Sequence, residues 1–263
     1  MSALGLQEKA LIGLFLALPA VVLAAYGVRV AVVGRALDPR VQRESSTVLL
    51  GRFPIEAFHW VLRGVGRAVS RSGISPDALT LISLVISGAS LPLAAFGMLP
   101  AAGASLLFGA AFDALDGIVA RERGLASDAG EVLDAVVDRY ADAAPLLGLA
   151  IYYRDSVTSL ILVLAAVLGS MLVSYVRAKS EAMSLSLPGG LMRRHERIAY
   201  LTVGLLVGPL LHLASVPVEA PLTLLAVGVV AVVSNIAAVQ LTRAARVALV
   251  ELGRGPQARG PRA

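Results

Sequence analysis

Four aspartates, Asp113, Asp116, Asp134 and Asp138, lie in a stretch of the chain that is otherwise largely apolar. A charged side chain near the centre of a bilayer costs roughly 2.5–3.5 kcal/mol on insertion scales. Four such acids without partners would offset the stability of a typical domain, which is about 5–15 kcal/mol. They must therefore be neutralised, and carboxylate oxygens are the ligands that hard divalent cations such as Mg²⁺ prefer.

The spacing of the acids divides them between two helices. Asp113 and Asp116 share one helix face with Arg121, and Asp134 and Asp138 share a face of a second helix that follows a polar loop at 122–129. Two facing helices that each offer two acids form an oxygen-rich cage for a divalent cation. Such a metal suits a phosphate-bearing substrate, for which an arginine is a further partner.

Small residues and an arginine complete a pattern of eight positions at fixed spacing. The eight are Asp113, Asp116, Gly117, Ala120, Arg121, Gly130, Asp134 and Asp138. The pattern resembles the motif of the CDP-alcohol phosphotransferases, the membrane enzymes that build phospholipid head groups. Two alternatives are that the acids are polar contacts between buried helices, or that they line the cation path of a transporter.

The resemblance implies a role for each of these positions. The matching family carboxylates, here Asp113, Asp116, Asp134 and Asp138, bind one or two divalent ions, Mg²⁺ or alternatively Mn²⁺. The residue that matches Asp138 also serves as the base that deprotonates the acceptor hydroxyl. The positions expected to bind the CDP group are Gly117, Ala120, Arg121, Pro76 and Thr80. The segment that contains Pro76 and Thr80 has an alternative explanation: Ser75 caps a helix whose first residue is Pro76.

A second basic cluster bears on the acceptor alcohol. The segments 174–181 and 190–197 resemble those of the bacterial phosphatidylinositol-phosphate synthases within the same family. The resemblance implies that the phosphate of inositol phosphate is held by Ser174, Arg177, Arg194 and Arg197. Arg194 and Arg197 are three residues apart and so share a helix face. The alternative is that the cluster is only a positively charged stop signal at the membrane surface.

The composition predicts a membrane protein. The chain has 263 residues, of which 57% are hydrophobic, and no cysteine, with a mean hydropathy of +0.79. We therefore expect an all-α, polytopic helix bundle with six core transmembrane helices, one extra N-terminal span and an interfacial amphipathic helix. The net charge of +5 suits anionic lipids and phosphate substrates rather than nucleic acid.

Three regions follow from the order of the apolar segments. Residues 1–51 are an N-terminal anchor and linker, in which the apolar run is too long for a typical signal peptide. Residues 52–242 are the catalytic membrane domain, including an amphipathic helix at 53–71, and residues 243–263 are a basic tail. The further spans are expected at 79–96, 101–120, 132–153, 157–176, 198–213 and 221–241, with a tight turn at Leu99 and Pro100. Asp142 lies outside the motif and is expected to make a structural contact, with Arg139 as its partner.

The distribution of charge predicts the orientation. Nineteen of the 23 lysines and arginines fall on one side if the chain spans the membrane seven times with its N-terminus outside. The motif acids then lie at the cytoplasmic ends of their helices. We therefore expect a multi-pass protein of the inner or plasma membrane whose active site faces the cytoplasm.

These observations predict an enzyme of phospholipid biosynthesis. By resemblance it is a Mg²⁺-dependent transferase that moves the phosphatidyl group of CDP-diacylglycerol to an alcohol, inositol phosphate being preferred and glycerol phosphate or another alcohol the alternative. The rival of a different class is an ion or proton transporter. A homodimer is expected from the family alone.

Overall fold

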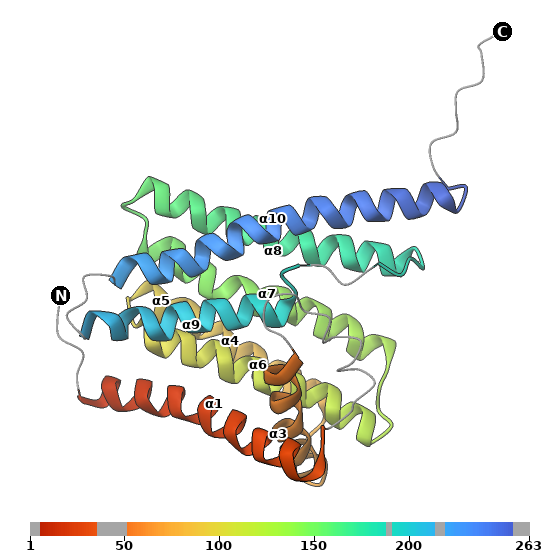
Figure 1. The fold of residues 1–263 in the computed structure, drawn as a ribbon. Coiled ribbons are helices and arrows are strands. Elements are labelled where there is room, and N and C mark those ends of the chain that lie inside the picture. Colours follow the sequence, from red (N-terminus) through yellow and green to blue (C-terminus); the bar gives the residue numbers. More distant parts are fainter. Residues whose placement is uncertain (1–5, 36–51, 188–190, 214–218, 255–263) are drawn as a thin grey trace.

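The computed structural model describes residues 6–35, 52–187, 191–213 and 219–254 (Figure 1). All the regular structure within these residues is helical, which confirms the predicted fold class. The helices are α1 (Leu6–Val33), α3 (Arg52–Ser70), α4 (Pro76–Gly88), α5 (Ser90–Ala95), α6 (Leu99–Glu122), α7 (Asp128–Tyr152), α8 (Val157–Ala182), α9 (Arg194–Leu213) and α10 (Glu219–Glu251). The predicted linker at 35–51, apart from Arg35, and residues 255–263 of the basic tail lie outside the described residues.

Four segments of the described chain are long and apolar enough to cross a membrane: Pro76–Ala95, Leu99–Glu122, Val157–Ala182 and Leu222–Glu251. Large apolar side chains on these segments face outward, among them Val85, Ile161 and Leu225, with 73%, 61% and 61% of their surfaces exposed. Outward-facing apolar side chains on helices of this length suit a lipid environment. The protein is therefore a membrane protein, whereas the expected number of seven spans stays a prediction.

Most of the helices run side by side, and α3 lies across their direction (Figure 1). The largest apolar core lies among α5, α6, α7, α8, α9 and α10, where Leu106, Val163, Leu205 and Val227 are almost fully buried. The helix α7 is absent from the four apolar spans because its charged residues extend beyond its first turns, to Asp138, Arg139 and Asp142. It nevertheless packs against α4, α5 and α8. The polar helix is thus held within the bundle by its neighbours.

The segment expected as one span at 79–96 corresponds to one candidate span, Pro76–Ala95, which consists of two helices. Helix α4 ends at Gly88, and α5 begins at Ser90. The cause lies one turn further on, because Pro92 has no N–H to donate to the carbonyl of Gly88. The hydroxyl of Ser90 instead donates to the carbonyl of Ser87 at 2.5 Å. The start of α4 agrees with the prediction, since the Ser75 hydroxyl accepts the N–H of Ala78 at 3.2 Å and Pro76 is the first helical residue.

The tight turn predicted at Leu99 and Pro100 lies just before these residues. Both already belong to α6, and Gly97 makes the turn with a φ of +78°. Proline is tolerated at this point because the first N–H groups of a helix have no partner within the helix. Glycine adopts positive φ without the steric cost that a side chain adds. The prediction was therefore wrong by two residues.

Close approach of the helices depends on small residues. A Cβ atom on Gly109 of α6 would collide with Ser87 of α4, and one on Gly148 of α7 would collide with the carbonyl of Leu91 in α5. Small residues are enriched where membrane helices pack, because they let the backbones come together. These two contacts bring α6 and α7 against the α4–α5 segment.

The N-terminal helix packs on the amphipathic helix. Tyr26 of α1 is fully buried, and its hydroxyl donates to Oε2 of Glu56 in α3 at 3.0 Å. Its ring also lies 5.3 Å from that of Phe53 and 5.8 Å from that of Trp60. In turn α3 packs on α6, where Gly66 meets the side chain of Ile118. The location of α3 at the membrane interface stays a prediction.

Replacing Tyr26 with Phe should weaken the contact between α1 and α3. The substitution keeps the ring but removes the hydroxyl that donates to the buried Glu56 carboxyl, so we expect a loss of about 1–2 kcal/mol of unfolding free energy. Unfolding of the purified protein in detergent micelles, followed by circular dichroism, measures the change. The control is Tyr140→Phe, because Tyr140 is 65% exposed on α7. Equal stability of the two variants would contradict the expectation.

Candidate metal and substrate site

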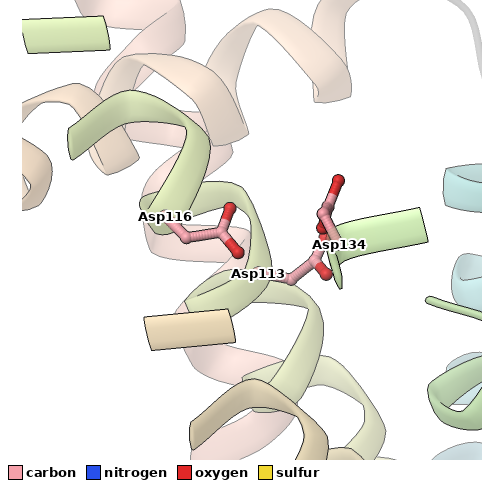
Figure 2. Close-up of side chains that lie close together, drawn as sticks. All are labelled: Asp113, Asp116 and Asp134. Carbon is pink, nitrogen blue, oxygen red and sulfur yellow. The ribbon is translucent and has the colours of Figure 1, made fainter. Parts of the chain in front are cut away.

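Three of the four predicted metal ligands come together. Oxygen atoms of Asp113, Asp116 and Asp134 all lie within 4.8 Å of one another, and Figure 2 shows the side chains facing a common space between α6 and α7. Asp116 is buried and the other two are half-buried. A buried oxygen of Asp113, Oδ1, has no hydrogen-bond partner among the described residues. This set of hard oxygen donors fits a divalent cation.

Neighbouring elements fix the positions of these acids. The Thr80 hydroxyl, from the first turns of α4, donates to Oδ2 of Asp116 at 2.5 Å. Ser127 caps α7 by accepting the N–H of Gly130 at 3.2 Å, and Arg123 donates to the carbonyl of Ile74 at 2.8 Å. The loop between α6 and α7 is thus tied to the start of α4. A partner that orients a ligating carboxylate is a usual part of a metal site.

A cavity of about 430 Å³ opens beside two of these acids. All five predicted CDP-binding residues line it: Pro76, Thr80, Gly117, Ala120 and Arg121. A Cβ atom on Gly117 would lie 3.0 Å from Nη1 of Arg121, so glycine leaves this arginine its place at the wall. Four polar lining residues were not singled out in the sequence: Asp77, Ser127, Asp128 and Glu131. The sequence signal that could have identified these four residues is their position at the starts of α4 and α7.

The fourth motif acid, Asp138, has a different neighbour. Its Oδ1 atom lies 2.9 Å from Nη2 of Arg194, and it does not belong to the group of three acids. Arg194 also donates from Nη1 to Oδ2 of Asp113 at 2.5 Å. One guanidinium group from the start of α9 therefore lies between acids of α6 and α7. The sequence pattern contained no indication of this contact.

Asp142 continues the line of acids one turn further along α7, and its partners differ from the predicted one. Its Oδ1 accepts from Nε of Arg194 at 3.2 Å, and its Oδ2 accepts from Nη2 of Arg197 at 2.5 Å. Arg139 instead lies 3.7 Å from Asp138. The predicted pair with Arg139 was wrong because Asp142 is buried and faces the two guanidinium groups at the start of α9. Asp142 does make polar contacts between helices, as predicted.

The predicted acceptor residues are only partly brought together. Arg197 Nη2 donates to the Ser174 hydroxyl at 3.3 Å, which joins α9 to α8. With Arg194 these residues form one network. No hydrogen bond or ion pair among the described residues links Arg177 to it; Arg177 lines a second cavity, of about 420 Å³, at the end of α8. The buried Nη2 of Arg177 has no hydrogen-bond partner among those residues.

The start of α9 is fixed by its own sequence. The carboxylate of Glu196, which is fully buried, accepts the backbone N–H of Arg193 at 2.8 Å. A glutamate at the third helical position commonly satisfies the N–H of the residue that precedes the helix. Helix α9 therefore begins at Arg194, four residues before the predicted span, and this places Arg194 and Arg197 in its first turns.

Comparison with known proteins agrees with the fold and with the motif. A family model described as CDP-alcohol phosphatidyltransferase matches residues 73–238. The phosphatidylinositol phosphate synthase of Mycobacterium tuberculosis is 36% identical over 153 residues, which are 56% of this chain and 70% of that protein.

Two crystal structures of a Mycobacterium tuberculosis phosphatidylinositol phosphate synthase are also similar. One has CDP-DAG bound; it is 30% identical with a TM-score of 0.63, and the match covers 77% of this chain and 98% of that one. The other is a complex with manganese and citrate, with the same identity and TM-score, and covers 77% of this chain and 93% of that one.

Loss of single acids should weaken binding of Mn²⁺. Asp113→Asn, Asp116→Asn and Asp134→Asn each remove one charged oxygen donor, and Thr80→Val removes the hydrogen bond that orients Asp116. Loss of a residue that orients a metal ligand, as in Thr80→Val, usually costs 10–100-fold in metal affinity. We therefore expect at least about a tenfold loss of Mn²⁺ affinity in all four variants. Electron paramagnetic resonance of free Mn²⁺ measures the affinity directly.

The matched control for these variants is Asp155→Asn. Its side chain is 90% exposed at the turn between α7 and α8, so its Mn²⁺ affinity should equal that of the unaltered protein. Unchanged affinity in Asp134→Asn would contradict the assignment of the three-acid group as a metal site.

Proposed function

The chain belongs to the CDP-alcohol phosphatidyltransferase family, and from this premise we propose that it transfers a phosphatidyl group from CDP-diacylglycerol to inositol phosphate, releasing CMP. The observation that carries the proposal is the cavity beside Asp116 and Asp134, which all five predicted CDP-binding residues line. The transporter alternative is less well supported, because the acids gather at one end of the α6–α7 hairpin beside this cavity. Acids of a transporter would more typically lie at mid-membrane, across repeated elements.

Asp113, Asp116 and Asp134 are the proposed ligands of the catalytic ion, with Asp138 as a further ligand. Mg²⁺ is the proposed physiological ion and Mn²⁺ an alternative, since both accept carboxylate oxygens. When bound, such an ion supplies charge neutralisation to a diphosphate and to the leaving CMP. The three-acid group and the manganese complex of the similar structure support a metal at this place.

The CDP group is proposed to occupy the 430 Å³ cavity. Arg121 is a partner for the phosphates of the CDP group. Gly117 and Ala120 have little or no side chain, so a nucleotide can approach the backbone of α6. Pro76 and Thr80 bound the opposite wall at the start of α4. The diacylglycerol chains would then extend into the surrounding lipid.

Asp138 is the proposed general base. Its carboxylate accepts the proton of the acceptor hydroxyl, whose oxygen forms the new bond to the phosphorus of the phosphatidyl group while the bond from that phosphorus to CMP breaks. Arg194, 2.9 Å from Asp138, holds the carboxylate in place beside the metal ligands. A positioned base of this kind typically contributes a factor of about 10²–10⁴ to the rate.

Inositol phosphate is the proposed acceptor, and its phosphate is assigned to Ser174, Arg177, Arg194 and Arg197. Arginine is suited to phosphate because its planar group can donate two parallel hydrogen bonds. The name of the Mycobacterium tuberculosis relative supports this acceptor. Glycerol phosphate, which carries the same charged group, is the alternative, and a stop signal without a binding role is the other reading of the cluster.

The proposed setting is the inner or plasma membrane, with the site facing the cytoplasm. The excess of basic residues at the site's end of the bundle supports this orientation. We keep the division into an N-terminal anchor at 1–51, a catalytic domain at 52–242 and a basic tail at 243–263 as part of the proposal. A homodimer is proposed from the family resemblance alone.

The proposed reaction predicts that CMP is released from CDP-diacylglycerol with Mg²⁺ when inositol phosphate is the acceptor, and not with free inositol or serine. Asp138→Asn should lower the rate by about 10²–10⁴-fold because the base is lost. Excess Mg²⁺ should not restore this rate, whereas it would if Asp138 served only as a metal ligand. Chelation of divalent ions should abolish release in the unaltered protein.

Glycerol phosphate in place of inositol phosphate separates the two acceptor assignments. Release of CMP with glycerol phosphate alone would contradict inositol phosphate and retain the transferase. A folded protein that releases no CMP with any acceptor would contradict the transferase proposal itself.

The absence of native cysteine allows a clean test of orientation. Glu122→Cys marks the loop beside the site, and Asp155→Cys marks the turn between α7 and α8. A membrane-impermeant maleimide should label Asp155→Cys in intact cells and Glu122→Cys only in inverted vesicles. The reverse pattern would contradict the cytoplasmic location of the site.

A further inference from the structure

We propose that Asp142 is a positioning residue for the phosphate of the acceptor, acting through Arg194 and Arg197. The inference rests on the proposed function, which assigns these two arginines to that phosphate. Asp142 itself belongs neither to the eight-residue motif nor to the group of three acids.

Both oxygens of Asp142 are committed to these arginines. Oδ1 accepts from Nε of Arg194 at 3.2 Å, and Oδ2 accepts from Nη2 of Arg197 at 2.5 Å. The Asp142 side chain is only 6% exposed. The two oxygens of this buried carboxylate therefore both face arginines, and neither belongs to the group of acids that could hold a metal. Its effect must therefore pass through the arginines.

The contact at Nε determines where the rest of Arg194 points. A guanidinium group is planar and rigid, so fixing Nε fixes the directions of both terminal nitrogens. Nη1 then meets Asp113 at 2.5 Å and Nη2 meets Asp138 at 2.9 Å. Asp142 thereby fixes the position of Arg194, which is assigned to the phosphate, relative to Asp138, the proposed base.

Arg197 is held in the same way from another side. Its Nη1 donates to the carbonyl of Met192 at 3.1 Å, and its Nη2 reaches both Asp142 and the Ser174 hydroxyl. The Arg197 side chain is 4% exposed, and its buried Nε has no hydrogen-bond partner among the described residues. An unpartnered, buried donor next to a fixed one provides a place for an anionic oxygen.

The sign of the effect follows from two opposing contributions. Removing the negative charge of Asp142 would by itself favour a nearby phosphate. It would also leave Arg197 buried without its anionic partner and leave Nε of Arg194 without its acceptor, while Asp113 and Asp138 still contact the terminal nitrogens of Arg194. Both arginines would therefore be less well ordered. Preorganised donors bind more tightly because they do not have to be ordered on binding. Since Arg197 is almost fully buried, we expect the loss of preorganisation to dominate.

The decisive variant is Asp142→Asn, which keeps the shape and removes the charge. Calorimetric titration of the purified protein with inositol phosphate, without CDP-diacylglycerol, should show affinity reduced about tenfold or more. In the CMP-release assay the KM for inositol phosphate should rise by a similar factor. The KM for CDP-diacylglycerol and the affinity for Mn²⁺ should stay within about twofold, which a general loss of structure would not allow.

A second variant, Asp142→Glu, keeps the charge and shifts it by one methylene, so it also serves if Asp142→Asn does not fold. Positioning predicts a severalfold higher KM for inositol phosphate in this variant, whereas mere neutralisation of the arginines predicts no change. The control is Asp155→Asn, at the exposed turn between α7 and α8, which should leave both KM values unchanged.

The outcomes separate this inference from the proposed function. Unchanged affinity for inositol phosphate in folded Asp142 variants would overturn the inference and leave the transferase proposal intact. Equal losses for both substrates and for Mn²⁺ would also overturn it, because they indicate a purely structural role. Unaltered protein that binds inositol phosphate but releases no CMP would contradict the proposed function alone, and protein that binds no inositol phosphate would overturn the inference with the acceptor assignment.

Discussion

The structure depends on neutralising a row of carboxylates inside an apolar bundle. Arg194 is central to this, because its guanidinium group contacts Asp113, Asp138 and Asp142 at 2.5, 2.9 and 3.2 Å. Breaking one partner out of a buried ion pair is far more costly than replacing the pair as a whole, since the remaining charge stays buried. The start of α9 is consequently tied to α6 and α7. Any ligand that recruits this arginine must act on the acids at the same time.

The remaining elements serve to hold the α6–α7 hairpin and the start of α9 in this arrangement. Small residues let α6 approach α4 and α7 approach α5 closely. Ser127 caps the start of α7 at the loop, and Glu196 caps the start of α9, which carries Arg194 and Arg197. Helix α1 supports α3, which in turn packs on α6. The polar site is thus surrounded by packing that does not depend on the site's own charges.

The cavity and the arginine network lie on two sides of the acids, so the two proposed substrates could be held next to each other. The cavity that suits a nucleotide lies on the side of Thr80 and Asp116, and the arginine network lies on the side of Asp138 and Asp142. Asp113 links the two, since an oxygen of Asp113 lies within 4.8 Å of oxygens of Asp116 and Asp134, which line the cavity, and Asp113 also accepts from Arg194. A donor in the cavity and a phosphorylated acceptor at the arginines would therefore meet at the proposed metal ligands.

The sequence by itself determined the helical class, the motif acids and the approximate positions of most helices, because these depend on composition, on residues three or four apart and on local caps such as Ser75. The five CDP-binding residues that it predicted line one cavity, since Gly117, Ala120 and Arg121 follow Asp116 on one helix, and their binding of CDP stays a prediction. Only the tertiary structure decided which cations meet which acids. Arg194 and Asp113 are 81 residues apart, and no local periodicity relates them. For the same reason Asp142 seemed to face its neighbour Arg139, whereas burial directs it to α9.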